Sequence, residues 1–432
     1  MNFCVIRSGR GFVAPSRVTP SGVLSLSVID SLPVLRCYAR TLHVFKYGPR
    51  AAQVIKDALA KALVSYFPLA GRLESSGAGQ LLQIACSGEG VWFVEASANC
   101  ELASVDYFDD VLSIPYDELL PEDHPPQTDE ARRPLVLMQV TQFACDGFVI
   151  GLSFCHSLCD GLGAAQFLRA VGELARGFDH PNVSPVWHRD FLRLLEQQKG
   201  ETFASELHPK RPLPSPPLLP QPTYRLEQAN IDIPLDHINQ LKRKFHESTG
   251  RTCSSFEVIA ATLLKHRTQA AISNAQVVKL VFFANCRQLV EPALPKGFYG
   301  NCFFPVSVTA SSETLSESDN AHEAVKMIQE AKARLPVEFA KWAKGEAEED
   351  PFAPPLGYTT LFISEWGRLG FNEVDYGWGP PIHVVPIQGS PIIPVGIVAS
   401  LPSPKKGVRL MTWCVDGPHL RTFLSQMATH LQ

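Results

Sequence analysis

The sequence has few charged residues and no long hydrophobic run, and each absence excludes a class of protein. Charged residues make up 19% of the 432 residues, and the formal net charge is −4. Because no basic stripe interleaved with aromatic residues is present, the chain lacks the electrostatic footprint of a nucleic-acid-binding protein. No apolar run reaches the length that spans a bilayer, and residues 1–7 lack the charged-then-apolar plan of a secretory signal. We therefore expect a cytosolic protein that binds neither nucleic acid nor membrane.

The cysteines are numerous but do not occur in close pairs. The chain has 11 cysteines, an odd number, and none stands in a Cys-x-x-Cys pair. Cys155 and Cys159 are separated by three residues, yet no second pair of cysteines or histidines at metal-ligand spacing lies nearby. We interpret the cysteines as reduced thiols that mostly fill the core. The sequence therefore predicts neither a disulfide scaffold nor a metal site.

The length and composition predict two compact domains. The hydrophobic fraction is 45%, and 432 residues exceed what a single core usually serves. Residues 209–222 are so rich in proline that they exclude a helix or a central strand. We expect a crossover linker at 201–222 between an N-terminal half, residues 1–200, and a C-terminal half, residues 223–432. A surface loop without fixed structure is the alternative.

Both halves mix helices with strands, which indicates an α/β (α+β) protein with mixed β-sheets flanked by helices. Apolar residues at helical spacing predict helices, and short apolar runs predict strands. The expected helices are 51–63, 161–176, 254–268 and 321–335, and the expected strands are 81–86, 91–94, 135–143, 148–154 and 277–284. Asp146 and Gly147 stand between two of these strands and predict a hairpin turn.

The segment 153–161, Ser-Phe-Cys-His-Ser-Leu-Cys-Asp-Gly, is the strongest candidate for chemistry. It is typical of an apolar strand that ends in His156, followed by a turn and a helix. A histidine in that place reaches a cleft from a rigid support, and its near-neutral pKa suits removal of a proton from an alcohol or amine. Of the 13 histidines, only His156 has an aspartate four residues later. On its own this spacing is weak, because it also arises by chance.

A second unusual segment lies far downstream. Residues 375–380 read Asp-Tyr-Gly-Trp-Gly-Pro, which predicts a tightly specified turn. Here Asp375, Gly377, Trp378 and Gly379 are candidates for a structural role, with the tryptophan buried between two glycines.

Together the two segments resemble the plant BAHD acyltransferase family, which carries HxxxD and DFGWG in that order. Three further segments agree with the family, namely Tyr-Phe-Pro-Leu-Ala-Gly-Arg at 66–72, Ala-Asn-Cys-Arg at 284–287 and Gly-Phe-Tyr-Gly-Asn at 297–301. The resemblance runs from about residue 12 to the C-terminus. The segment from Ser153 to Leu168 is most similar to the branch that holds alcohol, taxane and polyamine acyltransferases.

Two positions depart from the family's pattern. Tyr376 stands where phenylalanine is usual, and its hydroxyl is tolerated if the ring edge reaches water or a polar partner. Leu264 stands where many members carry tryptophan, which would reshape a pocket.

The resemblance implies a fold of two chloramphenicol-acetyltransferase-like halves with a channel between them. It also implies transfer of a hydroxycinnamoyl, benzoyl or acetyl group from acyl-CoA to a hydroxyl or amine of a plant specialised metabolite. His156 would act as general base, and acyl-CoA would be a co-substrate rather than a permanently bound cofactor. An acyl-enzyme is not expected, because no Gly-x-Ser-x-Gly nucleophile motif is present. By resemblance the protein is a monomer.

Two readings of Asp160 remain open. It either orients the His156 ring, as the acid of a catalytic triad does, or it pairs with a buried cation. The resemblance implies an ion pair with Arg287, and we predict that pairing.

Five further residues are candidates for the site. Trp366 and Ser364 match positions where the family carries a tryptophan and a hydroxyl residue in the active site. The indole N–H of Trp366 would donate to the oxyanion, or the ring is simply part of the core. Asn301 is either a turn residue or a lining of the cleft or oxyanion site. Ser254 and Ser255, at the start of an expected helix, are candidates for CoA contacts.

Two rival functions have to be weighed. A peptide condensation domain also uses His-x-x-x-Asp-Gly, but such domains carry a second histidine where this chain has Cys155. A degenerate homologue that only binds acyl-CoA or a metabolite is the other rival. The presence of His156, Asp160, Arg287 and Asp375 favours an enzyme.

Overall fold

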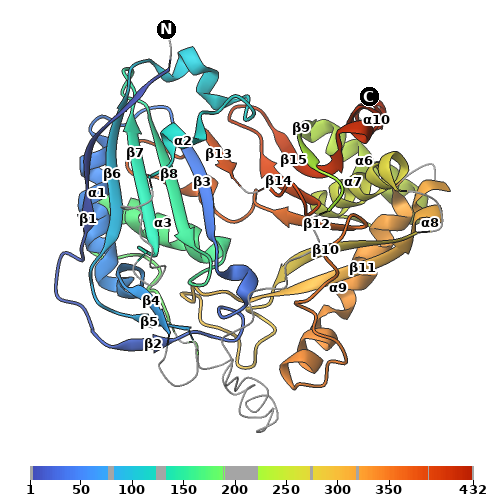
Figure 1. Ribbon diagram of the computed structural model, residues 1–432, viewed down its shortest axis with the longest axis horizontal. Helices are drawn as coiled ribbons and strands as arrows, with labels where there is room; N and C mark the ends of the chain where they lie inside the picture. Colours follow the sequence, from blue (N-terminus) through green and yellow to red (C-terminus); the bar gives the residue numbers. More distant parts are fainter. Residues whose placement is uncertain are drawn as a thin grey trace.

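The computed structural model describes residues 3–75, 82–122, 133–187, 189, 222–272, 276–317, 321–387 and 389–430. The described residues form two six-stranded sheets, drawn on the left and right of Figure 1, and a small three-stranded sheet. The predicted linker at 201–222 lies outside the described residues apart from Pro222. The limits of the two sequence halves therefore stay a prediction.

The first sheet has the strand order β1-β6-β7-β8-β3-β13. Its strands are β1 (Val5–Val13), β6 (Val91–Ala98), β7 (Val136–Gln142), β8 (Phe148–Cys155), β3 (Tyr38–Phe45) and β13 (His383–Pro386). The predicted hairpin joins β7 to β8, and Asp146 adopts the left-handed conformation with φ +59° at its turn. Helices α1 (Ala51–Ser65) and α3 (Gly161–Ala175) pack against each other beside this sheet (Figure 1). The short helix α2 (Tyr116–Leu119) contacts β8.

The second sheet has the strand order β11-β10-β12-β14-β15-β9. Its strands are β11 (Phe303–Ser311), β10 (Val277–Asn285), β12 (Thr360–Glu365), β14 (Val395–Ser400), β15 (Gly407–Asp416) and β9 (Leu226–Pro234). The helices on this side of the molecule are α6 (Leu235–Thr249), α7 (Ser255–Ala271), α8 (Ser312–Glu317), α9 (His322–Ala343) and α10 (Gly417–His430). The small sheet consists of β2 (Val23–Ser25), β5 (Leu82–Ala85) and β4 (Arg72–Ser75).

Helix α7 is the central helix of the second half. It contacts α6, α8, α9 and α10, and most of its length is buried. Leu264 is 1% exposed and packs into the hydrophobic core between these helices and the second sheet. The leucine therefore fills a core position, and the expectation that it reshapes a pocket finds no support.

One strand from the C-terminal half of the sequence belongs to the first sheet. Strand β13 comes from the C-terminal half of the sequence, yet it pairs antiparallel with β3 at the edge of the first sheet. Both large sheets are mixed, because β6 pairs parallel with β7 and β12 pairs parallel with β10 and β14. The predicted α/β architecture with mixed sheets is confirmed, but a division of the sequence into halves does not divide the sheets.

Three general features follow from the described residues. No helix among them combines the length and the apolar character that a membrane span needs. All 11 cysteines lie in the described ranges and are free thiols. No group of three or more His, Cys, Asp or Glu side chains within these ranges is placed to hold a metal ion.

Candidate active site

His156 follows directly on the last residue of β8. That strand lies between β7 and β3, and all eight of its residues are buried. The backbone N–H of His156 donates to the carbonyl oxygen of Cys37 at 2.9 Å, which extends the strand pairing to the histidine itself. A half-buried imidazole is therefore carried on one of the most rigid parts of the first sheet.

The two nitrogens of the His156 ring lie in different environments. The Nδ1 atom is buried, and no described residue makes a hydrogen bond to it. The Nε2 atom is not buried, and it also makes no hydrogen bond to a described residue. The ring of Phe303 from the second sheet lies 6.4 Å away in an edge-to-face arrangement. The histidine therefore sits where the two halves meet, with Nε2 left for a ligand.

Asp160 forms a bidentate ion pair with Arg287. The guanidinium Nη1 donates to Oδ2 at 2.8 Å and Nη2 donates to Oδ1 at 2.8 Å, and each side chain is 12% exposed. Oδ1 also accepts from the backbone N–H of Gly163 at 3.0 Å, so that Asp160 caps α3. Burial by itself lowers the pKa of Arg287, but the charge and hydrogen bonds of Asp160 outweigh it and raise the pKa.

This geometry separates the two readings of Asp160. Within the described residues its carboxylate accepts from Gly163, Arg287 and the backbone of Cys302, and the His156 ring is not among its partners. The structure thus brings Asp160 together with Arg287, the pairing that the family resemblance implies, and does not place it as the acid of a triad.

A second buried ion pair, which was not predicted from the sequence, lies beside the same turn. Asp30 and Arg189 are 0% and 1% exposed, and their nearest charged atoms are 3.0 Å apart. Arg189 Nη2 also donates to the carbonyl oxygen of Leu158 at 2.7 Å. The positions of the two residues follow no spacing pattern, so that only the three-dimensional structure reveals the pair.

Asn301 is fully buried between this ion pair and the histidine. Its Nδ2 group donates to Asp30 Oδ1 at 2.8 Å and to the carbonyl oxygen of His156 at 2.7 Å. Both side-chain N–H bonds are therefore engaged. This favours the structural reading of Asn301 over a donor to the oxyanion.

The loop after β12 packs against the start of α3. A Cβ atom added at Gly161 would lie 2.5 Å from the side chain of Leu369, so this loop touches the turn that follows the histidine. Trp366 lies at the beginning of the loop, is 8% exposed and stacks on Phe371 with ring centroids 5.8 Å apart. Ser364 is half-buried on β12. Trp366 thus packs in the core of the first half while its loop borders the site, so both readings of its role stay open.

Residues 375–379 form a turn far from the histidine. Asp375 Oδ1 accepts from the backbone N–H groups of Gly377 at 2.8 Å and Gly379 at 2.9 Å, and both glycines have positive φ. Trp378 contacts Phe148 at the opposite end of β8, which has eight residues and therefore spans about 27 Å. The turn thus holds the chain against the far end of the first sheet, which favours the structural role predicted for it.

Tyr376 does not meet the condition set for it from the sequence. Its side chain is 2% exposed and packs edge-to-face on Phe45, with ring centroids 5.4 Å apart. The hydroxyl is buried, and no described residue makes a hydrogen bond to it. Burial raises the pKa of Tyr376 accordingly. No polar group in the described part of the chain therefore reaches this hydroxyl.

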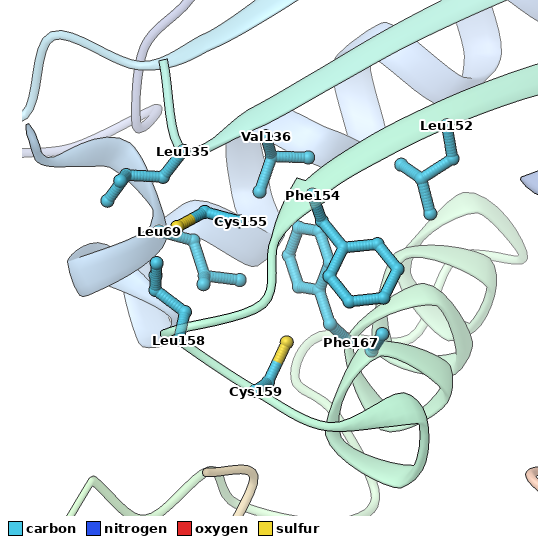
Figure 2. A pocket seen from close by; sticks show the side chains of 10 residues that line it. Leu69, Leu135, Val136, Leu152, Phe154, Cys155, Leu158, Cys159 and Phe167 are labelled. Carbon is cyan, nitrogen blue, oxygen red and sulfur yellow. The ribbon is translucent and has the colours of Figure 1, made fainter. Parts of the chain in front are cut away.

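The cysteines beside the histidine turn away from it into apolar surroundings. Figure 2 shows the sulfur atoms of Cys155 and Cys159 among leucine and phenylalanine side chains, around a cavity of about 10 Å³ behind the turn. Burial raises the pKa of Cys155 to about 12 and also raises the pKa of Cys159. Neither thiol forms the thiolate that a nucleophile needs near neutral pH.

The start of α7 is already satisfied by its own residues. Ser254 Oγ accepts from the backbone N–H of Glu257, and Glu257 Oε2 accepts from the backbone N–H of Ser254, which is a complete capping box. Glu257 also pairs with Lys332 at 2.7 Å. Ser254 is therefore a poor candidate for a CoA contact. The hydroxyl of the half-buried Ser255 makes no hydrogen bond to a described residue, so Ser255 stays a candidate.

Comparisons with known proteins agree with this fold. A family model described as the Transferase family matches residues 4–427. Acyl transferase 4 of Oryza sativa subsp. japonica is 44% identical, with 99% of each chain covered. A myricetin 3-O-glucosyl 1,2-rhamnoside 6'-O-caffeoyltransferase of Crocosmia x crocosmiiflora is 40% identical, again with 99% of each chain covered.

Two solved structures share the fold at low identity. Vinorine synthase matches with a TM-score of 0.71 and 20% identity, covering 99% of this chain and 98% of its own. The F. sporotrichioides TRI101 protein, complexed with coenzyme A and T-2, matches with a TM-score of 0.69 and 11% identity, covering 94% and 97%.

The chain therefore belongs to this transferase family, and the resemblance to the plant BAHD acyltransferases is confirmed. It is an acyltransferase with the expected two-half fold. Neither the condensation-domain reading nor the purely binding homologue is favoured.

Removing the charge of Asp160 should chiefly destabilise the protein. We expect Asp160→Asn to lower the free energy of unfolding by about 3 kcal/mol, because it leaves the Arg287 guanidinium buried without its counter-ion. Glu373→Gln is the matched control, since Glu373 pairs with Arg169 through a side chain that is 69% exposed. The control should change stability by less than about 0.5 kcal/mol. Chemical denaturation measures both. An Asp160→Asn protein of unchanged stability that has lost turnover would instead support the orienting role.

Removing the hydroxyl of Tyr376 should stabilise the protein. Tyr376→Phe keeps the ring in the core and removes a buried hydroxyl without a partner, so we expect the free energy of unfolding to rise by about 1 kcal/mol. Tyr358→Phe is the control, because the Tyr358 hydroxyl donates to Asp416 Oδ1 at 2.9 Å. That variant should lose a similar amount. A destabilised Tyr376→Phe in the same denaturation experiment would mean that the hydroxyl has a partner after all.

Proposed function

We propose that the chain transfers an acyl group directly from acyl-CoA to a hydroxyl or amine of a small molecule, with His156 as general base. The observation that carries this proposal is the asymmetric setting of the imidazole. Its Nδ1 atom is buried without a hydrogen bond to a described residue, its Nε2 atom is not buried, and the ring lies edge-to-face with Phe303 of the second sheet. One positioned base is what this reaction needs.

The proposed cycle needs no other proton carrier. His156 Nε2 accepts the proton of the acceptor O–H or N–H while the acceptor atom attacks the thioester carbonyl carbon. The tetrahedral intermediate then collapses, its C–S bond breaks, and the proton passes from Nε2 to the departing CoA sulfur. The products are an ester or amide and free CoA, and the imidazole returns to its neutral form.

The thiols around the histidine support direct transfer without an acyl-enzyme. Cys155 and Cys159 flank His156 in sequence, but burial keeps both protonated, and their sulfur atoms point into the apolar cavity of Figure 2. Because a neutral buried thiol is a poor nucleophile, the acyl group passes from CoA to the acceptor without first being attached to the enzyme.

We propose Trp366 as the donor to the oxyanion. Its loop lies against Gly161 in the turn after the histidine, and an indole N–H donates without competing as a base. Asn301 is the weaker candidate, since both of its side-chain N–H bonds are already used. Ser364 stays a candidate for lining the cleft from β12.

An aromatic acyl group is the donor that we favour. The phenylalanine ring beside His156, Phe303, is itself in contact with the 47% exposed ring of Phe283, so a planar acyl group would find apolar surface next to the base. The caffeoyltransferase relative acts with a group of this kind, by its name. Hydroxycinnamoyl and benzoyl groups fit this surface better than acetyl. We further propose a monomer that works in the cytosol, as its reduced thiols would allow.

We propose that the phosphates of CoA bind beside the start of α7. A pocket of about 350 Å³ there is lined by Lys242, Arg243 and His246 of α6 and by Thr252 and Cys253 before α7. Its lysine and arginine charges suit phosphate. Lys332 pairs with Glu257 in the first turn of α7 and neutralises its charge, so that this carboxylate does not repel an anion.

The first experiment measures thiol release from acyl-CoA. Acetyl-, benzoyl- and coumaroyl-CoA are crossed with a panel of alcohols and polyamines, using the wild type and His156→Ala. We expect the variant to lose at least about 10²-fold in kcat, since a general base contributes that much or more. His180→Ala, at an exposed histidine, should keep wild-type turnover. Undiminished turnover in a folded His156→Ala protein would contradict the mechanism, and no turnover with any substrate pair would favour a binding protein.

Reversing one charge of the basic pocket tests the CoA site. We expect Lys242→Glu to raise KM for acyl-CoA about tenfold, because the new carboxylate repels the phosphates, and to leave KM for the acceptor unchanged. Lys244→Glu is the matched control, an exposed lysine of the same helix that does not line the pocket. Equal effects of the two variants on KM for acyl-CoA would show that only the general charge of the helix matters.

A further inference from the structure

A set of buried polar residues fixes the backbone of the turn that carries the histidine. Two carbonyl oxygens of this turn accept hydrogen bonds from the other parts of the chain. His156 O accepts from Asn301 Nδ2 at 2.7 Å, and Leu158 O accepts from Arg189 Nη2 at 2.7 Å. The backbone is thus held at the base itself and again two residues further on.

Asp30 joins the two donors. Its Oδ1 atom accepts from Asn301 Nδ2 at 2.8 Å and from Arg189 Nη1 at 3.2 Å, and the backbone N–H of Asn301 donates to the same oxygen at 3.2 Å. Oδ2 accepts from the backbone N–H of Ser27 at 3.0 Å and from its hydroxyl at 2.7 Å. The carboxylate is fully buried and fully hydrogen-bonded, so it holds the donors in one arrangement.

The arginine has no room to move away. Its guanidinium lies over the Trp187 ring at 4.0 Å and over the Phe298 ring at 5.3 Å. A Cβ atom at Gly300 would lie 1.4 Å from Arg189 Nη1, so the guanidinium occupies the space that a side chain at residue 300 would need. Because the guanidinium is closely packed on these sides, its hydrogen bond holds the Leu158 carbonyl oxygen in one position.

The His156 ring depends on this support more than a triad histidine would. In a triad, a carboxylate bonded to Nδ1 orients the ring, whereas here Nδ1 has no hydrogen-bond partner among the described residues. The orientation of the imidazole is then set by its own backbone and by the rings packed around it. A shift of the His156 carbonyl therefore becomes a shift of Nε2 relative to the acceptor.

We propose that Asp30, Arg189 and Asn301 are positioning residues that act on the reaction through the backbone of the His156 turn. The inference rests on the proposed function of His156 as general base. It predicts that these residues control kcat more than substrate binding, because none of them needs to touch a substrate. A misplacement of the base by about 1 Å would lower the rate by about 10²-fold.

The test compares Asn301→Leu and Asp30→Asn with the wild type. Asn301→Leu removes the side-chain hydrogen bonds to the His156 carbonyl oxygen and to Asp30. Asp30→Asn keeps the shape of the residue 30 side chain but removes its charge. We expect kcat per folded molecule to fall by about 10²-fold for Asn301→Leu, with KM for both substrates within about threefold of the wild type. Arg189→Lys, which keeps a charged donor, should retain more of kcat than Arg189→Met.

Arg409→Met is the control for a purely structural loss. Arg409 is another buried cation, 5% exposed and paired with Asp232 at 2.6 Å and Asp109 at 2.9 Å, and neither partner belongs to the His156 turn. This variant should lose stability but keep the wild-type kcat of its folded fraction. Should Asn301→Leu fail to fold, Asp30→Asn and the Arg189 pair of variants carry the same comparison.

A readout without turnover separates this inference from the proposed function. The NMR signal of ¹³Cε1-labelled His156, assigned by its loss in His156→Ala, should move in Asn301→Leu and Asp30→Asn and stay in place in Arg409→Met. If the wild type transfers no acyl group at all, the proposed function fails, while the NMR comparison still decides the network. Unchanged kcat per folded molecule, or an unmoved His156 signal in both network variants, would overturn the proposal.

Discussion

The turn from His156 to Asp160 is held between two ion pairs that are both largely withdrawn from water. Asp160 pairs with Arg287, which stands 127 positions further along the chain. The Asp30–Arg189 pair contacts the same turn through the carbonyl oxygen of Leu158. A buried ion pair contributes little net stability over apolar packing, but breaking it leaves an uncompensated charge. The arrangement therefore penalises any displacement of the turn, and the position of the base depends on it. Both halves of the sequence contribute to this restraint.

The two halves are joined again at the far end of the first sheet. Strand β13 from the C-terminal half adds an edge to that sheet, and the turn at 375–379 packs on α3, where a Cβ at Gly172 would lie 2.4 Å from the Asp375 carbonyl oxygen. These contacts lie away from His156, so they act by fixing the orientation of one half to the other.

The sequence predicted what local chemistry determines. Periodicity and apolar runs located the helices α1, α3, α7 and α9 and the strands β5, β6, β7, β8 and β10, and Ser254 and Glu257 at the start of α7 form a capping box. The Asp160–Arg287 pairing came from the family resemblance, not from spacing. The Asp30–Arg189 pair had no comparable signal, because a buried ion pair between distant residues depends on how the chain folds back. Strand β13 is one of several strands that were not predicted, and its four residues are too few to show a periodicity of their own.

Burial also explains why the two cysteines close to His156 do not interfere with acyl transfer. A thiolate within reach of a thioester would capture the acyl group and compete with the acceptor. Here Cys155 ends the buried strand and Cys159 faces the core, and loss of solvent raises the pKa of both thiols because the thiolate is the charged form. The same burial that makes β8 a rigid support thus keeps its neighbouring thiols unreactive. The proposed base, His156, follows directly on the same strand.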